Sequence, residues 1–214
     1  MVSLPTGSTS PSRREYDQSM SMSETPVLEN AWVRLEPLSL DHRDDLVAAV
    51  TPGEIWRAWY ATTPSPESMA DEIDKRLADQ DAGTRAPWAI VDPASGRAVG
   101  MTSYLHLAPT DRHLEIGSTW IGSAAQGTKI NPAAKLLLLQ RAFEDLHCVR
   151  VELRTHFQNH QSRAAIEKLG AKLDGVLRRH MILPNGSIRD TCVYSVLDYE
   201  WENVRLGLEA RLAR

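Results

Sequence analysis

The sequence of 214 residues predicts an α+β fold, with strands and helices mixed along the chain. First, from Val27 onward, segments that alternate apolar and polar residues occur between segments whose apolar residues recur at helical spacing. Second, two strand-like segments flank a turn at 92–96 and predict a β-hairpin. Third, residues 114–155 have the pattern of a strand, a glycine-containing loop, a helix and a second strand.

The composition excludes several functional classes. With 42% hydrophobic and 24% charged residues, it is typical of a globular protein, and the net charge of −4 argues against a nucleic-acid partner. Cys148 and Cys192 lie far apart and form no zinc motif, so we expect no metal and a reducing, cytoplasmic setting. No apolar run approaches the ~20 residues of a membrane-spanning helix, so we expect no membrane partner.

Two regions differ in composition. Residues 1–25 are rich in serine and proline and hold almost nothing that could be buried, so we expect a disordered tail. Residues 26–214 are predicted to form a single domain, because the predicted sheet runs unbroken across the middle of the chain.

The domain is expected to begin with a strand and three helical segments. The strand covers 33–36, and Ser39 can cap a helix that begins near Leu40 and is stopped at 52–53. A second helical stretch is expected at 55–60. The third helix is expected to take Ser65 as its cap and Pro66 in its first turn and to end at 82–83, with apolar residues at Met69, Ile73 and Leu77.

The middle of the chain is rich in strands. The hairpin joins strands at 88–91 and 98–107, and a further strand covers 114–121 with Glu115 set between apolar neighbours. The loop 122–132 then enters a helix, and a strand follows at 149–155. Unpaired N–H groups at a helix N-terminus can bind an anion, so this loop indicates a phosphate-bearing ligand, although many such loops bind nothing.

The last elements are two helices and a hairpin. Asn159 opens a helix that Gly170 closes, and strands at 172–183 and up to residue 196 flank a turn at 184–187. The final helix carries an apolar stripe made of Trp201, Val204, Leu208 and Leu212.

Several of these segments together carry a family resemblance: 114–117, 126–127, Asn131 with 135–138, 159–170, 175–178, 183–186 and 189–190. In this order they resemble the GCN5-related N-acetyltransferases (GNAT), and most closely the RimJ/RimL-type branch that acetylates ribosomal-protein N-termini. The resemblance implies an acyl-CoA donor, most simply acetyl-CoA, and a primary amine acceptor, either a protein or peptide N-terminus or a small molecule. It also implies a mixed, mostly antiparallel sheet of about seven strands that splays in the middle and is flanked by helices.

Amine acylation requires an uncharged amine, so a base must take a proton before attack. By resemblance that base is Glu115, and Ser162 replaces the tyrosine with which many members protonate the leaving sulfur. Two alternatives remain: Glu115 is a solvated carboxylate or a partner of Arg112, and Ser162 only supports the start of its helix. Because both cysteines lie in strand-like runs, we expect direct transfer in a ternary complex rather than an acyl-cysteine intermediate.

The resemblance also implies binding residues. Those for the cofactor are Ser118, Trp120, Ile121, Gln126, Gly127, Thr128, Lys129, Ile130, Asn131, Asn159 and Arg163, and those for the acceptor are Trp56, Trp59, Tyr104 and Arg189. Lys129 and Asn131 depart from the family pattern, which has small residues at these positions. The alternative is therefore a catalytically silent CoA-binding protein that serves as a sensor or scaffold, and either a monomer or a homodimer is compatible with the sequence.

Overall fold

A computed structural model describes residues 21–60 and 62–214, and the following statements concern these residues. The strands are β1 (Leu28–Asn30), β2 (Val33–Pro37), β3 (Ala86–Asp92), β4 (Arg97–Ala108), β5 (His113–Ile121), β6 (Arg150–His156), β7 (Lys172–Ile182) and β8 (Ile188–Leu197). They form one sheet in the order β1-β2-β3-β4-β5-β6-β8-β7. All neighbouring strands are antiparallel except β5 and β6. The mixed, mostly antiparallel sheet is confirmed, with eight strands rather than about seven, because the three-residue β1 is too short to give a sequence pattern.

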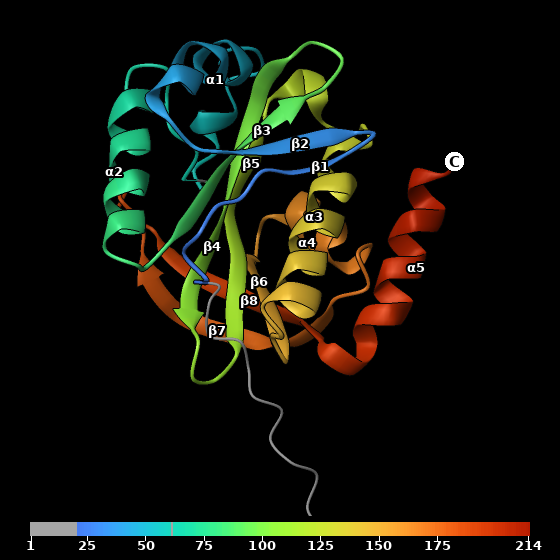
Figure 1. Cartoon of the computed structure of the whole chain (residues 1–214). Coiled ribbons are helices and arrows are strands. Elements are labelled where there is room, and N and C mark those ends of the chain that lie inside the picture. The colour runs from blue at the N-terminus through green and yellow to red at the C-terminus, as the bar shows by residue number, and fades with distance from the viewer. Residues whose placement is uncertain (1–20, 61) are drawn as a thin grey trace, which may run out of the picture.

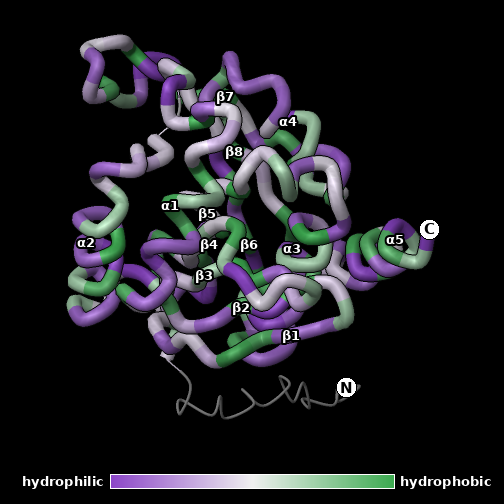
Figure 2. Tube along the Cα trace, turned by 90° about the horizontal axis from the view of Figure 1, so that it is seen from above, coloured by the Kyte–Doolittle hydropathy of each residue, from purple (hydrophilic) through white to green (hydrophobic). Residues whose placement is uncertain are grey.

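Helices cover both faces of this sheet. They are α1 (Arg43–Val50), α2 (Met69–Asp81), α3 (Ile130–Gln140), α4 (His160–Glu167) and α5 (Trp201–Leu212). Helices α1 and α2 lie on one side, and α3, α4 and α5 lie on the other (Figure 1). Viewed from above, apolar segments gather between these layers (Figure 2). Two apolar clusters result, one under α1 and α2 and a larger one under the other three helices, which includes the predicted stripe of α5.

The start of the folded region lies earlier than predicted. Residues 1–20 of the predicted disordered tail lie outside the described residues, but Met22 is 7% exposed and belongs to the larger core cluster. The guanidinium of Arg141 donates to the backbone oxygens of Ser21 and Glu24. The boundary at residue 25 is therefore wrong, because one buried methionine and backbone carbonyls fix this segment without leaving a compositional signal.

Two predicted helix positions were also wrong. Residues 55–60 form only a 3₁₀ turn at Ile55–Arg57, because Glu54 has a left-handed backbone with φ of 45° and Ala58 is extended. The third helix begins at Met69, and Ser65 instead closes a turn in which its backbone N–H donates to the hydroxyl of Ser68. Hydroxyl-to-backbone bonds of this kind favour turns over helices.

The sheet splays between β5 and β6. These parallel strands pair at only three positions, and Glu115 opposite Glu152 is the last of them, although β5 continues to Ile121 and β6 to His156. Beyond that pair the β6-facing edge of β5 has no strand partner. A register shift against β4 accompanies a left-handed backbone at Ser118, where φ is 47°, as in a β-bulge. The splay that the resemblance implied is therefore confirmed, and Glu115 lies where it opens.

Candidate active site

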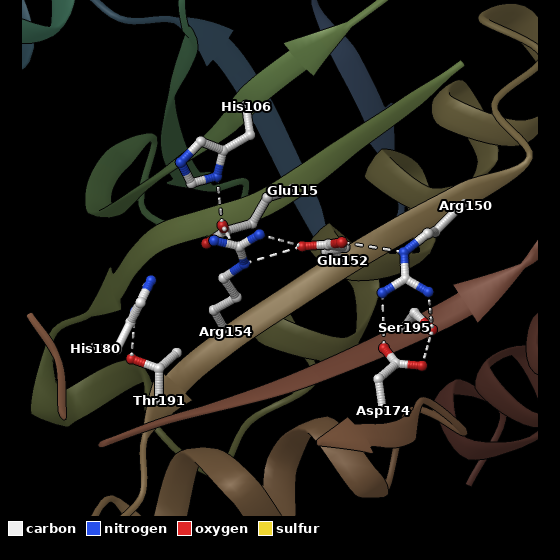
Figure 3. Close-up of polar contacts among 9 residues, drawn as sticks. All are labelled: His106, Glu115, Arg150, Glu152, Arg154, Asp174, His180, Thr191 and Ser195. Atoms are coloured by element: carbon white, nitrogen blue, oxygen red, sulfur yellow. Dashed lines mark hydrogen bonds and ion pairs between the residues drawn. The ribbon is translucent and has the colours of Figure 1, made fainter. Parts of the chain in front are cut away.

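Glu115 is a buried carboxylate held by two basic side chains. It is 6% exposed, and its Oε2 atom lies 2.8 Å from Nδ1 of His106 on β4 and 3.4 Å from Nε of Arg154 on β6 (Figure 3). Its neighbours Leu114 and Ile116 point into the larger core, because successive strand residues face opposite sides of a sheet. The alternative of a solvated carboxylate is therefore wrong, and Glu115 pairs with His106 and Arg154.

Arg154 is the first member of a chain of alternating charges that runs along β6 and ends at Asp174 on β7. Its guanidinium donates to Oε2 of Glu152, and Arg150 donates to Oε1 of Glu152 and to Asp174 (Figure 3). Burial acts to raise the pKa of Glu152, but hydrogen bonds from Arg154 and Arg150 outweigh it and hold that pKa below its usual value. Glu152 therefore stays ionised at neutral pH and fixes the positive charge of Arg154 beside Glu115.

His106 connects Glu115 with solvent. The hydrogen bond that the His106 ring donates to Glu115 is the main cause that raises the pKa of His106, against an opposing effect of burial. The imidazole side chain is 61% exposed, whereas the Glu115 side chain is 7% exposed. The exposed imidazole therefore lies between the buried carboxylate and solvent. His106 and Arg154 were not predicted from the sequence. Leu105 is the residue of β4 opposite Glu115, and a left-handed backbone at His106, with φ of 49°, breaks the regular alternation of side chains there.

Gly117 makes room for the Glu115 carboxylate. A Cβ atom at this position would overlap Oε1 of Glu115 and lie 2.9 Å from a methyl group of Leu105.

We therefore expect Gly117→Ala to displace the carboxylate and lower kcat about 10- to 100-fold, since small misplacements of a catalytic group have effects of this size. Steady-state kinetics, with the affinity for CoA measured in parallel, checks this. Unchanged kcat in a folded variant would contradict the role given to the Glu115 position.

The start of α3 presents unpaired backbone donors. Gly127 has a left-handed backbone with φ of 76°, which turns the chain toward the helix. The backbone N–H groups of Gly127, Thr128, Lys129 and Asn131 have no acceptor within residues 21–60 and 62–214. Such a group of donors at the positive end of a helix suits a phosphate, so this segment fits the pyrophosphate of CoA.

The side chains of this loop are used for structure. The hydroxyl of Thr128 donates to the backbone oxygen of Ala125 and accepts from the backbone of Ile130, and the amide of Gln126 donates to the backbone oxygen of Ile121. The ammonium of Lys129 donates to the backbone oxygen of Leu212 and lies 4.1 Å from the centre of the Trp32 ring. The structure therefore does not favour a contact between the Lys129 ammonium and a phosphate. Backbone carbonyl groups at the C-terminus of α5 attract this ammonium instead.

The other predicted cofactor residues surround the splay. Ser118, Trp120 and Ile121 line the unpaired part of β5, and Ile130 and Asn131 lie in the first turn of α3 rather than in the loop. The indole Nε1 of Trp120 is buried and has no hydrogen-bond partner among the residues described.

Asn159, Ser162 and Arg163 lie at the start of α4. Oδ1 of Asn159 accepts from the backbone N–H of Ser162 and so caps α4, and the helix predicted to open here is confirmed. The Ser162 hydroxyl has no partner in the described part of the chain, whereas Arg163 donates to the Tyr194 hydroxyl and lies over the Phe157 ring.

The predicted acceptor residues divide into two groups. Tyr104 is fully buried, and its hydroxyl donates to the backbone oxygen of Leu138, so its assignment to the acceptor was wrong. Trp56 packs against the cluster under α1 and α2 and belongs to the core. Trp59 is 49% exposed and lines a cavity. Arg189 is half-buried; burial lowers the pKa of its guanidinium, and the charge of Glu115 acts against this. Trp59 and Arg189 remain candidates.

Comparison with known proteins decides the family. The model of the Acetyltransferase (GNAT) domain matches residues 33–172. The chain belongs to the GNAT acetyltransferase family. Its α+β fold with the splayed sheet agrees with a GCN5-related N-acetyltransferase from Brucella melitensis, which is 30% identical, with a TM-score of 0.81 and coverage of 88% of this chain and 86% of that one.

Two further relatives extend the comparison of this GNAT protein. Bacillus subtilis (strain 168) YdaF, provisionally named a ribosomal N-acetyltransferase, is 36% identical over 107 residues. That match covers 50% of this chain and 57% of YdaF, so it spans less than two thirds of that relative. RimJ of Mycobacterium smegmatis in complex with CoA-disulfide is 19% identical, with a TM-score of 0.75 and coverage of 90% of this chain and 97% of RimJ, and shows the shared fold.

Within residues 21–60 and 62–214 of this GNAT protein, no group of three or more histidine, cysteine or acidic residues could hold a metal ion. In the same part of the chain, every helix is too short or too polar to cross a membrane.

Proposed function

We propose that the protein is an N-acetyltransferase that transfers the acetyl group of acetyl-CoA to the N-terminal α-amine of a protein or peptide. The observation that carries this proposal is the position of Glu115. It lies at the last pairing of β5 with β6, on the same strand that leads into the unpaired N–H groups before α3. A base and a phosphate site thus lie at the two ends of the unpaired part of β5.

The roles of the residues follow from the chemistry of amide formation. Bound acetyl-CoA supplies the activated thioester carbonyl. Glu115 accepts the proton of the attacking amine, and the His106 ring beside it holds the carboxylate in place. Backbone N–H groups on the unpaired edge of β5 can donate to the oxyanion, and the free hydroxyl of Ser162 is the candidate donor for the leaving thiolate.

Direct transfer is supported by the state of the cysteines. Cys148 and Cys192 are buried free thiols. Burial raises the pKa of Cys148 to about 12 and also raises that of Cys192. Neither thiol is a competent nucleophile at neutral pH, so an acyl-cysteine intermediate is disfavoured. Free thiols also suit the cytoplasmic setting expected from the sequence.

The choice of acceptor rests on the relatives. YdaF carries a provisional name as a ribosomal N-acetyltransferase and shares 36% identity over the matched region. We therefore favour a polypeptide N-terminus over a small-molecule amine.

Thiol release from acetyl-CoA, measured with a panel of unblocked peptides and small-molecule amines, tests the proposal. We expect turnover with peptides that have a free α-amine and none with the same peptides blocked at that amine. Tight CoA binding without turnover of any acceptor would instead indicate the catalytically silent CoA-binding protein. Turnover with small-molecule amines alone would show that the acceptor is a small-molecule amine and not a peptide N-terminus.

A further inference from the structure

His156, at the end of β6, has a buried hydrogen-bond donor that the protein does not use. The residue is 5% exposed, and its Nδ1 atom accepts from the backbone N–H of Gln158 at 3.0 Å. Burial is the main cause that lowers the pKa of His156, so the ring is neutral at pH 7. A neutral imidazole whose Nδ1 accepts must carry its hydrogen on Nε2. That buried Nε2–H has no partner in the described part of the chain.

The His156 residue also lines a cavity. It has a volume of ≈ 300 Å³ and is lined by Trp59, His156, Phe157, Arg179, Ile188 and Asp190. The rings of Trp59 and Tyr60 lie 5.0 Å and 5.9 Å from the His156 ring, so the donor sits among aromatic side chains. Asn185 in the β7–β8 turn donates to the backbone oxygen of Trp59 and ties that segment to the cavity wall. Since an unpaired buried donor costs free energy, a ligand that supplies an oxygen here would bind favourably.

The cavity is a neighbour of the Glu115 site. Arg189 lies close to both His156 and Glu115. Its charge acts to lower the pKa of His156, and the charge of Glu115 acts to raise the pKa of Arg189. His156 follows Arg154, the partner of Glu115, by two residues on the same strand. Two residues of a strand span about 7 Å, which is also the reach of two residues of an extended peptide.

We propose that this cavity binds the second residue of a peptide acceptor, whose backbone carbonyl oxygen accepts from Nε2–H of His156. The proposal rests on the proposed function, since it places the α-amine of the same peptide at Glu115. It deepens that function by requiring a carbonyl oxygen at a fixed distance from the reacting amine. An alkyl polyamine, which lacks such a carbonyl group, would leave the His156 donor unpaired.

Equilibrium binding to the CoA-loaded protein tests this without relying on turnover. The probes are unblocked tripeptide amides that begin with Ala, Ser or Met. In one analogue of each, an (E)-alkene replaces the second peptide bond and removes the carbonyl group in question. In the matched control, the alkene replaces the first peptide bond. We expect the first analogue to bind about tenfold more weakly than its parent peptide, which corresponds to leaving one buried donor unpaired.

The variant His156→Phe completes the comparison. We expect the variant to bind the parent peptide and the second-bond analogue with equal affinity. The affinity of the first-bond analogue relative to the parent peptide should be the same in the variant and the wild type. Equal binding of parent and second-bond analogue by the wild-type protein, or no binding of any peptide, would overturn the proposal even if the variant fails to fold. If the protein binds the peptides with the expected loss of affinity for the second-bond analogue but transfers no acetyl group, the proposed function is wrong and the proposed binding site is still supported.

Discussion

Glu115→Gln is expected to lower kcat at pH 7 by about 10²- to 10⁴-fold, the usual contribution of a positioned general base. Glutamine keeps the size of the side chain but cannot take the proton of the attacking amine. The variant then depends on acceptor molecules that are already uncharged, and a peptide α-amine has a pKa of about 8. The difference from wild type should therefore narrow as the pH rises to 9. A pH–rate profile of both proteins measures this.

Two controls separate catalysis from structure in this experiment. Glu152→Gln changes the carboxylate opposite Glu115 on β6 and should cause a much smaller loss of kcat. In Glu115→Gln the pKa of His106 should fall toward its usual value, because the hydrogen bond that the ring donates to the Glu115 carboxylate is the main cause that raises it. NMR titration of the imidazole detects this shift. An unchanged pH–rate profile despite the His106 shift would remove Glu115 from the mechanism.

Lys135→Met is expected to stabilise the protein at neutral and lower pH. Lys135 on α3 is 6% exposed, and its ammonium donates to the Thr119 hydroxyl. Burial is the main cause that lowers its pKa from 10.5 to about 7, a shift equivalent to at most about 5 kcal/mol. We expect the free energy of unfolding to rise by about 1–4 kcal/mol, the range found when buried charged groups are replaced by apolar side chains of similar volume. Thr119 keeps its hydrogen bond with Thr102.

The pH dependence of this gain is fixed by the same shift. Below pH 7 the ammonium is charged in both the folded and the unfolded chain, so the full cost of burying the charge is present. Between pH 7 and 10.5 only the unfolded chain holds the proton, and the cost disappears as the pH rises. The advantage of Lys135→Met should therefore shrink over this window, as measured by urea unfolding at a series of pH values.

Lys129→Met is the matched control for Lys135→Met. The Lys129 ammonium lies at the C-terminus of α5 and over Trp32 instead of inside the core, so its loss should destabilise slightly and without this pH dependence. A Lys135→Met variant that is less stable than wild type at every pH would show that the buried ammonium is favourably paired.

Local pattern was enough to predict most elements of the fold. Two helices, α2 and α4, lie where the sequence predicts them. Their signals are the spacing of Met69, Ile73 and Leu77 in α2, and Asn159 and Gly170 at the two ends of α4, and each signal acts within a few residues. The helical stretch at 55–60 failed because aromatic spacing does not reveal the left-handed backbone at Glu54.

The site was less predictable because its contacts cross strands. Glu115 was found through the family resemblance, but its partners come from β4 and β6, which only the sheet register brings together. Lys129 was expected among the residues that bind the cofactor, yet its ammonium donates to a backbone oxygen at a helix terminus 83 residues away in sequence. The buried donor of His156 depends on a backbone bond and on a distant tryptophan, and no spacing along the chain encodes either.

The central claim is that Glu115 at the splay drives direct acetylation of an α-amine. Single-turnover incubation of stoichiometric protein with acetyl-CoA and an unblocked peptide, followed by mass spectrometry of protein and peptide, tests it most directly. We predict one acetyl group on the peptide α-amine, none on the protein, and far slower product formation by Glu115→Gln. An acetylated protein intermediate, or an unmodified peptide in the presence of bound acetyl-CoA, would contradict the claim.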